Sequence, residues 1–329
     1  KNKLHLHIGS PKTGTTSIQS TLFKNRTELE NQKFCYPGNN VNHHAFFFTT
    51  KSTKNHWPRQ FKGIDKPSLN KSIKRFFSDV ENDFKKECQH YVISTEYLFI
   101  DDKEAIKNTI DYLKHFFSEV IVYVFVRNPI EYYTSFQQQM IKARSFVTPP
   151  GSFNYSFKSV IEAWSEFYPV QVTKYDQKVN SCEVFCGKIG IDYGELTDSG
   201  QGNNTSLSIE QLAVLEKIQR NIYPDKEDIF KPHLGVIQNI KAPFTNKPIL
   251  KKSVKQLIYN NHKKQLEWLK REWNIDFSED QYEGNEADLQ NSPQNKASVR
   301  DIFNIDEPAA ERYEALIIDA LLRQMVKKK

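Results

Sequence analysis

The 329-residue sequence contains no apolar run as long as a membrane span, and its mean hydropathy is −0.65. A helix that crosses a bilayer needs about 20 consecutive, mainly apolar residues. No signal peptide is visible either, because Lys1 leads at once into a strand-like pattern. We therefore expect a cytoplasmic protein without a membrane span. An upstream targeting or anchor segment stays open, because the first residue is not Met.

The sequence also has few cysteines and only a small excess of positive over negative charge. Of the four cysteines only Cys182 and Cys186 lie close together, and this spacing matches neither a zinc site nor a disulfide framework. We therefore expect reduced thiols and no metal site. The net charge of +6 suits an anionic nucleotide ligand, but it is too small to predict a nucleic-acid partner.

One segment stands out among the residues that are present. The segment Gly9-Ser-Pro-Lys-Thr-Gly-Thr-Thr-Ser-Ile18 follows a strand-like run and opens an amphipathic helix. Free backbone N–H groups and the helix dipole favour an anion at such a turn. Gly9 and Gly14 keep the spacing of a nucleotide triphosphatase loop, but Thr15 stands where that loop needs lysine. The lysine is Lys12, inside the loop, which argues for a phosphate-bearing donor other than ATP or GTP.

A second motif follows a buried strand. The apolar, β-branched run from 120 to 126 is typical of a parallel strand that is covered on both faces. It ends at Arg127, and Pro129 suits the first turn of a new helix. Ser135 comes about two helical turns after Arg127. The spacing predicts that Arg127 and Ser135 together hold one phosphate.

Together these motifs resemble the sulfotransferase family that uses 3′-phosphoadenosine 5′-phosphosulfate (PAPS), in particular its bacterial and carbohydrate-type members. The stretch Pro11-Lys-Thr-Gly-Thr-Thr16 is similar to the family's 5′-phosphosulfate loop. The stretch from 124 to 135 is similar to its 3′-phosphate motif, with the spacing from Arg127 to Ser135 kept. The resemblance implies PAPS as the donor and adenosine 3′,5′-bisphosphate as the product, with no metal required. The implied donor-binding residues are Pro11, Lys12, Thr13, Gly14, Thr15, Thr16, Arg127 and Ser135.

Alternating strand and helix patterns predict an α/β fold, with a P-loop-like parallel sheet flanked by helices. The resemblance makes this the sulfotransferase fold. We expect a core of residues 1–200 that binds PAPS, and a mainly helical part, 201–329, that packs on the same core. The predicted strands are 4–8, 90–94, 120–126 and 170–175. The predicted helices are 15–31, 68–88, 103–117, 129–144, 160–167, 181–189, 208–221, 250–273 and 308–326.

Three residues are candidates for the chemistry of sulfuryl transfer. Lys12 is the expected donor to the bridging oxygen of the leaving phosphate, and the alternative is a lysine on an exposed turn. Glu96 follows a strand at the edge where ligands bind in open α/β sheets, so it is one candidate base; otherwise it is a surface or capping carboxylate. His44 is the other candidate base, or else a solvated loop histidine.

The acceptor is expected to be a carbohydrate or polysaccharide that offers a hydroxyl or an amine. The family's cytosolic small-molecule enzymes carry a glycine-rich, lysine-bearing segment near the C-terminus, and none is evident here. Loop aromatics such as Trp57, Phe61 and Tyr97 could stack on sugar faces. Two rival hypotheses stay open. One is a P-loop kinase or NTPase whose Mg²⁺ is held near Asp101, Asp102 and Glu96. The other is a nucleotide- or glycan-binding protein without turnover.

Overall fold

Five parallel strands form one sheet in the part of the chain that the structure describes, in the order β2-β3-β1-β4-β5. The structure is a computed structural model, and it describes residues 2–53, 57–200, 206–224, 226–277 and 297–326. The strands are β1 (Lys3–His7), β2 (Phe34–Cys35), β3 (His90–Ser94), β4 (Glu119–Val126) and β5 (Val170–Lys174). Because all strands run parallel, their carboxyl ends share one edge of the sheet, which we call the carboxyl edge.

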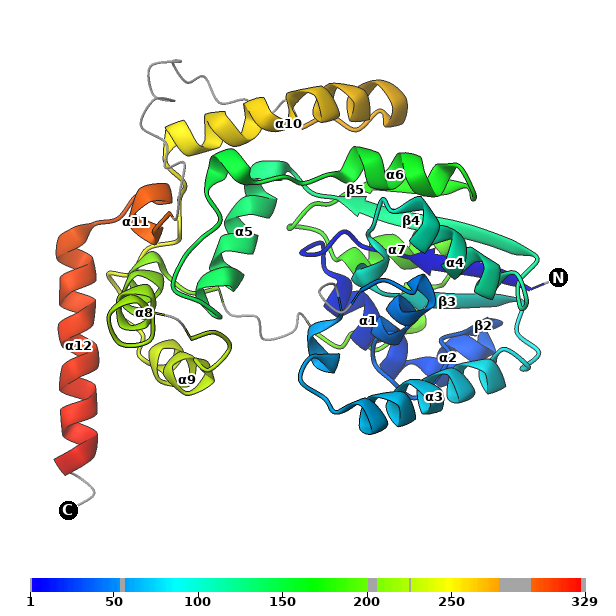
Figure 1. The fold of residues 1–329 in the computed structure, drawn as a ribbon, viewed down its shortest axis with the longest axis horizontal. Helices are drawn as coiled ribbons and strands as arrows, with labels where there is room; N and C mark the ends of the chain where they lie inside the picture. Colours follow the sequence, from blue (N-terminus) through cyan, green and yellow to red (C-terminus); the bar gives the residue numbers. More distant parts are fainter. Residues whose placement is uncertain (1, 54–56, 201–205, 225, 278–296, 327–329) are drawn as a thin grey trace. The chain divides into compact units, whose positions relative to one another are not determined.

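The chain divides into two compact units (Figure 1). Unit 1 comprises Lys1–Arg127, Ser156–Gly202 and Arg271–Ile275, and it holds the sheet. Unit 2 comprises Asn128–Tyr155, Asn203–Lys270 and Asp276–Lys329, and its described elements are helical.

The helices of unit 1 are α1 (Thr15–Lys24), α2 (Arg26–Asn31), α3 (Lys66–Asp83), α4 (Lys103–Leu113), α6 (Phe157–Ser165) and α7 (Ser181–Ile189). Short 3₁₀ helices add η1 (His44–Thr50), η3 (Arg59–Phe61) and η4 (Glu96–Leu98). Unit 2 contains α5 (Pro129–Ile141), α8 (Ile209–Ile222), α9 (Lys231–Asn239), most of α10 (Lys252–Trp273), α11 (Val299–Ile302) and α12 (Glu307–Val326).

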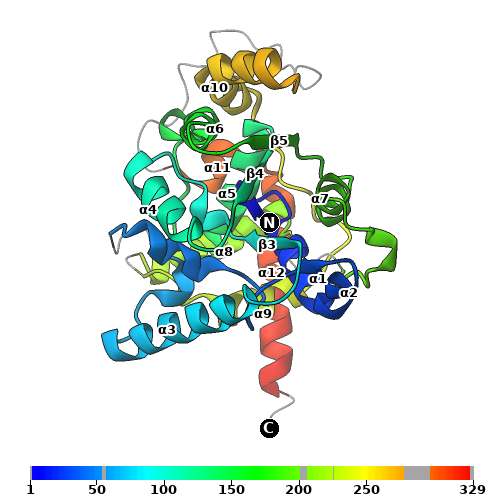
Figure 2. The same ribbon diagram turned by 90° about the vertical axis from the view of Figure 1, so that its right-hand side faces the viewer.

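Helices cover both faces of the sheet (Figure 2). Helices α4 and α6 lie over one face, and α1 and α7 pack together over the other. Leu4, Leu6 and Ile8 are fully buried, and so are Val122 and Val124 of β4. Burial on both faces explains why these strands read as apolar runs. The predicted α/β class, with a parallel sheet flanked by helices and a helical C-terminal part, is confirmed.

Helix α1 shows where the sequence prediction was wrong. A single helix was expected over 15–31, but the chain turns at Asn25 between α1 and α2. The Asn25 side-chain amide donates to the carbonyl oxygens of Thr21 at 2.7 Å and Thr197 at 2.8 Å. The backbone N–H of Thr197 in turn donates to Asn25 Oδ1 at 2.8 Å. A contact with a residue so distant in sequence ends α1, and no local pattern announces it.

The segment between α2 and α3 was expected to be irregular, but it contains β2, η1 and η3. Strand β2 has only two residues, Phe34 and Cys35, which is too short for a periodic pattern. In η1 the hydroxyls of Thr49 and Thr50 donate to the carbonyl oxygens of Phe46 and Phe47. Helix α9 was also missing from the prediction.

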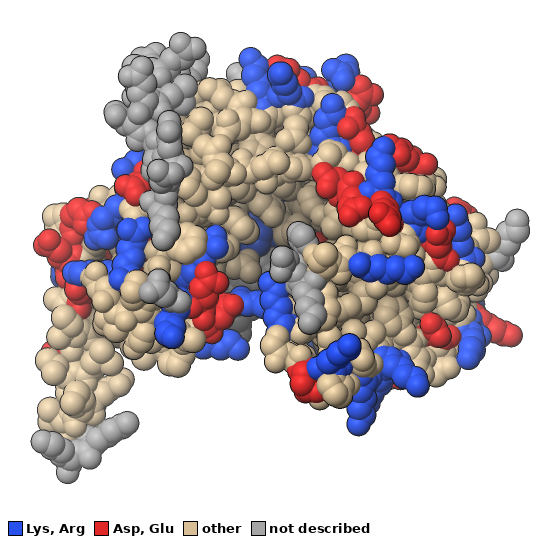
Figure 3. Space-filling model, viewed as in Figure 1, with Lys and Arg blue, Asp and Glu red and all other residues tan. Residues whose placement is uncertain are grey.

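Lys and Arg are interspersed with Asp and Glu on the face of the molecule in Figure 3. The C-terminal half of α12 differs, because Ile318, Leu321, Leu322 and Met325 are exposed there. Among the residues with described placement, no helix is both long enough and apolar enough to cross a membrane.

Candidate functional site

The loop between β1 and α1 is held in place by β4. The Ser10 N–H donates to the Phe125 carbonyl at 2.9 Å, and the Ser10 hydroxyl donates to the same oxygen at 3.0 Å. The Thr13 hydroxyl donates to the Ser10 carbonyl at 2.5 Å, which closes the turn. Ser10 and Thr13 are fully buried, so their hydroxyls serve the shape of the loop. We call residues 9–16 the phosphate loop.

Three residues of the phosphate loop adopt left-handed backbone conformations: Gly9 (φ 91°), Lys12 (φ 65°) and Gly14 (φ 80°). A lysine with positive φ is strained, and such strain concentrates at functional sites. Gly14 is the N-cap of α1 and makes no side-chain cap hydrogen bond. The first-turn amides of α1 therefore have no partner inside the helix or from the cap, as an anion site requires. A Cβ at Gly14 would lie 2.5 Å from Ser181 Oγ, so only glycine fits there.

Arg127 connects the end of β4 to the phosphate loop. Its Nη1 donates to the Lys12 carbonyl at 3.0 Å, and its Nη2 donates to Gln177 Oε1 at 3.3 Å. Its guanidinium carbon lies 4.9 Å from the centre of the Tyr175 ring. Arg127 thus supports the left-handed turn at Lys12 while its cationic group stays beside the loop.

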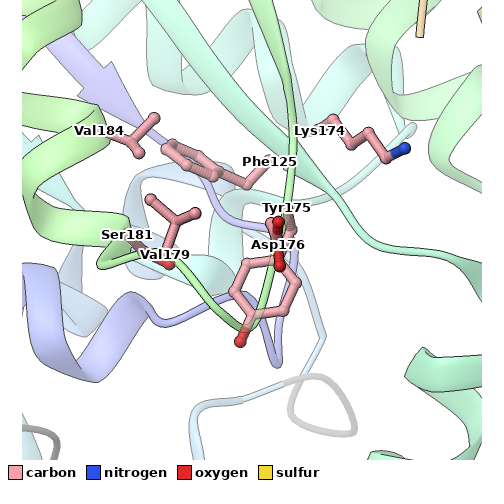
Figure 4. Close-up of a pocket in the computed structure, with 7 residues that line it drawn as sticks. All are labelled: Phe125, Lys174, Tyr175, Asp176, Val179, Ser181 and Val184. Atoms are coloured by element: carbon pink, nitrogen blue, oxygen red, sulfur yellow. The ribbon is translucent and has the colours of Figure 1, made fainter. Parts of the chain in front are cut away.

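A small cavity of about 100 Å³ adjoins the phosphate loop at the end of β5 (Figure 4). Phe125, Val179 and Val184 gather on one side of it, whereas the Lys174 side chain points away from them. Ser181, which also lines this cavity, is the residue that a side chain at Gly14 would meet. The loop, Arg127 and this cavity therefore form one continuous region of unit 1.

On the other side of the loop, Glu96 and His44 lie side by side. The two atoms His44 Nε2 and Glu96 Oε1 are 3.6 Å apart, and His44 Nδ1 is 3.2 Å from Thr95 Oγ1. Thr95 Oγ1 accepts from the Tyr97 N–H at 3.4 Å, so its own hydrogen can point to His44 Nδ1. Nδ1 is then the acceptor, and Nε2 carries the hydrogen toward Glu96. We call these two side chains the His44–Glu96 pair.

Glu96 also contacts the phosphate loop and α1. A Cβ at Gly9 would lie 3.2 Å from Glu96 Cβ, so β3 and the loop meet at this point. Gln19 Nε2 donates to Glu96 Oε2 at 3.1 Å and to the Ser94 carbonyl at 3.3 Å. Gln19 fixes one carboxylate oxygen, while the other faces His44. Sequence reasoning missed Gln19 and Thr95; Gln19 had a signal, because it lies in the first turns of the helix that follows the loop.

Burial lowers the pKa of His44, and the nearby Glu96 opposes this effect only in part. A lowered pKa favours the uncharged imidazole at neutral pH, so His44 faces the Glu96 carboxylate at 3.6 Å as a neutral group. The side chain of Glu96 is 23% exposed, against 12% for His44, so the carboxylate is the more accessible of the two. This geometry suits a carboxylate base that a neutral histidine orients.

The neighbouring histidines are structural. His43 is fully buried; its Nδ1 accepts from the Ser94 N–H at 3.0 Å, and its Nε2 donates to the Pro37 carbonyl at 2.8 Å. His5 Nδ1 lies 2.9 Å from the Tyr123 hydroxyl, and His7 Nδ1 lies 2.8 Å from Ser94 Oγ. Burial lowers the pKa of His43 to about 4 and that of His5 and His7 to about 3. All three hold the sheet and its loops together as neutral side chains.

The structure brings most of the predicted site residues together in unit 1. Lys12, Gly14, Glu96, His44 and Arg127 all belong to loops or turns at or beside the carboxyl edge. Pro11, Thr13, Thr15 and Thr16 complete the loop and the first turn of α1. Ser135 lies on α5 in unit 2, so its pairing with Arg127 on one phosphate stays a prediction.

No known family profile and no curated protein sequence matches this chain. Among solved structures, it is similar to a sulfotransferase domain from the curacin biosynthetic pathway, with 11% sequence identity and a TM-score of 0.31. The similarity covers 80% of this chain and 97% of that domain. At this level of similarity, the function has to be inferred from the site itself.

Proposed function

We propose that this protein is a sulfotransferase that moves the sulfuryl group of PAPS to a hydroxyl group of an acceptor, with a carbohydrate as the expected acceptor. The observation that carries the proposal is the contact between an anion-binding loop and a carboxylate. Gly9 opens the phosphate loop directly against Glu96, and Glu96 lies beside His44. A base held next to a phosphate site is what transfer from a phosphate-bearing donor to a hydroxyl requires.

The phosphate loop suits the 5′ end of the donor. Its glycines leave space where a Cβ would clash, and the first-turn amides of α1 can donate to phosphate oxygens. Lys12 adds a positive charge within the loop, and the Arg127 guanidinium, which already donates to the Lys12 carbonyl and to Gln177, adds a second charge for the 3′-phosphate. Tyr175 and the cavity behind it adjoin Arg127, so we expect the nucleoside on the side of β5.

The reaction then balances without a further reactant. The acceptor oxygen forms a bond to sulfur as the bond between sulfur and the 5′-phosphate oxygen breaks. The acceptor proton goes to Glu96, and the electron pair of the broken bond stays on the phosphate, which leaves as adenosine 3′,5′-bisphosphate. Lys12 and the amides of α1 stabilise the charge that develops on the leaving oxygen. His44 and Gln19 orient the Glu96 carboxylate without taking the proton.

The kinase hypothesis gains no support from the two aspartates that it named. Asp102 caps α4, where its Oδ1 accepts from the N–H groups of Glu104 and Ala105 at 3.0 and 3.1 Å. Asp101 accepts from the Ser159 hydroxyl at 2.7 Å. Both carboxylates thus have structural hydrogen bonds, and Thr15 still stands where an NTPase needs lysine.

Calorimetry with adenosine 3′,5′-bisphosphate, 5′-AMP and ATP tests the donor site. Wild type should bind the bisphosphate tightly, and Arg127→Ala should lose the preference over 5′-AMP. Arg127→Lys and Gln177→Ala serve as controls: the first keeps the charge but loses the guanidinium, and the second removes only the contact of Arg127 with Gln177. Equal or tighter binding of ATP, unaffected by Arg127→Ala, would overturn the proposal.

Transfer from PAPS to a panel of glycans then tests turnover. Lys12→Ala should leave bisphosphate binding measurable but lower the rate of transfer by about 10²-fold or more, since a charge-stabilising donor is lost. Turnover within a few-fold of wild type would contradict the role of Lys12. Tight bisphosphate binding with no transfer to any acceptor would favour the non-catalytic hypothesis.

A further inference from the structure

A second cavity of about 350 Å³ lies in unit 1, at the β2 end of the carboxyl edge. Three segments form its walls: the loop after β2, the turn around η3, and helix α3. Its volume falls in the range of roughly 300–1,000 Å³ that is common for small-molecule sites. None of the residues that line this cavity has a role in the transfer reaction proposed above.

Five of the eleven residues that line the cavity carry neutral hydrogen-bonding side chains. The loop after β2 contributes the amides of Asn39, Asn40 and Asn42, η3 contributes the amide of Gln60, and α3 contributes the hydroxyl of Ser72. A side-chain amide offers both donors and an acceptor, as a hydroxyl does. Such a set suits a ligand with many hydroxyl groups, each of which donates and accepts.

The charged and apolar parts of the lining agree with this assignment. Arg75 and Asp79 form an ion pair, with Arg75 Nε 4.0 Å from Asp79 Oδ2, so their formal charges cancel. Phe61 and Phe76 contribute apolar surface and are themselves only 7% and 6% exposed. An aromatic surface below polar groups matches a sugar ring, whose C–H faces are apolar and whose rim carries hydroxyls.

The walls are held in position before any ligand binds. The Gly38 N–H donates to Asp83 Oδ2 at 2.7 Å, and Arg26 Nη1 donates to the Gly38 carbonyl at 2.7 Å. These bonds fix the loop after β2 to α3 and α2. The Arg59 N–H donates to the Tyr97 hydroxyl at 3.2 Å, which ties the η3 turn to η4. Preorganised walls lower the entropic cost of binding.

The cavity adjoins the His44–Glu96 pair. Asn42 Oδ1 accepts from the His44 N–H at 3.4 Å, and the Tyr97 ring lies 4.8 Å from the His44 ring. In the strand order β2-β3-β1-β4-β5, the cavity lies at β2, Glu96 follows β3, and the phosphate loop follows β1. The Glu96 carboxylate therefore stands between the cavity and the loop along the carboxyl edge.

From this order we propose that the cavity binds an uncharged sugar unit of the acceptor and so delivers a hydroxyl to Glu96. The inference rests on the proposed sulfotransferase function, and it adds the position and the chemical class of the acceptor. The donor occupies the β1, β4 and β5 side of the edge, and the acceptor occupies the β2 and β3 side.

The test fills the cavity from an exposed position. Ser72 and Ser78 are both exposed serines on α3, but only Ser72 lines the cavity. Ser72→Trp should place an indole in the cavity, and Ser78→Trp is the matched control. The probes are cellotetraose and fully N-acetylated chitotetraose as neutral sugars and a tetrasaccharide with uronic acids as an anionic one. Their binding is measured by calorimetry with saturating adenosine 3′,5′-bisphosphate present.

We expect one of the neutral tetrasaccharides to bind wild type and Ser78→Trp equally, and to bind Ser72→Trp at least tenfold more weakly. The affinity for adenosine 3′,5′-bisphosphate should stay within twofold in all three proteins. Equal binding of that sugar to Ser72→Trp, binding of the anionic probe alone, or binding of no tetrasaccharide overturns the acceptor site and leaves the donor proposal intact. If wild type binds the sugar but does not bind adenosine 3′,5′-bisphosphate, the sulfotransferase proposal is overturned instead.

Discussion

The two sides of the carboxyl edge are built by different means. On the β1 and β4 side, main-chain conformation makes the site: glycines at positive φ, and amides and carbonyls shared with Phe125 and Arg127. On the β3 side, side chains make it: His43, His44, Thr95 and Gln19 form the hydrogen bonds around Ser94 and Glu96. We therefore expect the loop side to respond to changes of backbone freedom, and the β3 side to respond to isosteric changes and to pH.

The largest effect should come from Glu96→Gln on the β3 side. The amide keeps the shape of the side chain but cannot take a proton, so kcat should fall by about 10²–10⁴-fold. Bisphosphate affinity should stay within twofold, because the amide keeps the side-chain shape beside Gly9 and the backbone of the phosphate loop is unchanged. Glu104→Gln, at an exposed glutamate of α4, is the control for steady-state kinetics with PAPS. A fall of less than fivefold, combined with a large loss in His44→Gln, would make His44 the base.

On the loop side, Gly14→Ala should weaken bisphosphate binding by at least tenfold. The new Cβ would lie 2.5 Å from Ser181 Oγ and 2.7 Å from Ser181 Cβ, at a residue with φ 80°. Gly190→Ala is the matched control, because Gly190 has φ 90° and no atom within 4 Å of its Cβ position. The control should lose about 1–2 kcal/mol of stability from backbone strain and keep its affinity. Equal affinity in both variants would show that crowding at Gly14 does not matter.

Acid should destabilise unit 1 through its buried histidines. In the folded state the pKa of His43 is about 4 and that of His5 and His7 is about 3, against the ordinary value of 6.5. As the pH falls below about 6.5, the unfolded chain binds protons that the folded unit does not, so the free energy of unfolding falls. Each histidine contributes about 1.4 kcal/mol per pH unit between its two pKa values.

Urea unfolding at pH 7, 6 and 5 measures this slope. His43→Asn should be less stable at pH 7, because it loses the hydrogen bonds to Ser94 and Pro37. The slope of its free energy of unfolding against pH should be smaller than that of wild type, by the contribution of one titrating histidine. An unchanged slope in the variant would mean that His43 is protonated in the folded state.

The smallest effect is expected from Gln19→Leu. Leucine keeps most of the volume but loses the hydrogen bonds to Glu96 Oε2 and the Ser94 carbonyl. A less well oriented base should lower kcat about three- to tenfold, with KM and bisphosphate affinity nearly unchanged. If Gln19→Leu lowers bisphosphate affinity as strongly as kcat, Gln19 acts on the loop rather than on Glu96.

The sequence predicted the parts of the fold that have strong local patterns. Strands β3 and β4 and helix α7, with Gly190 at its end, lie where periodicity and turn residues placed them. The two-residue strand β2 and the break at Asn25 were not predictable, since one is too short for a pattern and the other depends on Thr197.

The candidate site was predicted residue by residue but not as an arrangement. Glu96 and His44 appeared as competing bases, because a linear sequence does not give the order of strands. The order β2-β3-β1 and the η1 turn place them 3.6 Å apart, which turns two alternatives into one pair. Gln19 was missed because its role depends on the position of β3 beside α1.

The strand order also sets a schedule for synthesis on the ribosome. β1 is made first, yet Leu4 pairs with Tyr91 and Val120, and the Ser10 N–H needs the Phe125 carbonyl. At roughly 5–20 residues per second, the chain needs on the order of ten seconds before β4 exists. During that time β1 lacks its β4 neighbour, even after β3 has been made, and the phosphate loop lacks the Phe125 carbonyl that holds Ser10. A nascent chain that stalls between β3 and β4 should therefore leave the β4 side of β1 exposed to chaperones, and we expect it not to bind adenosine 3′,5′-bisphosphate.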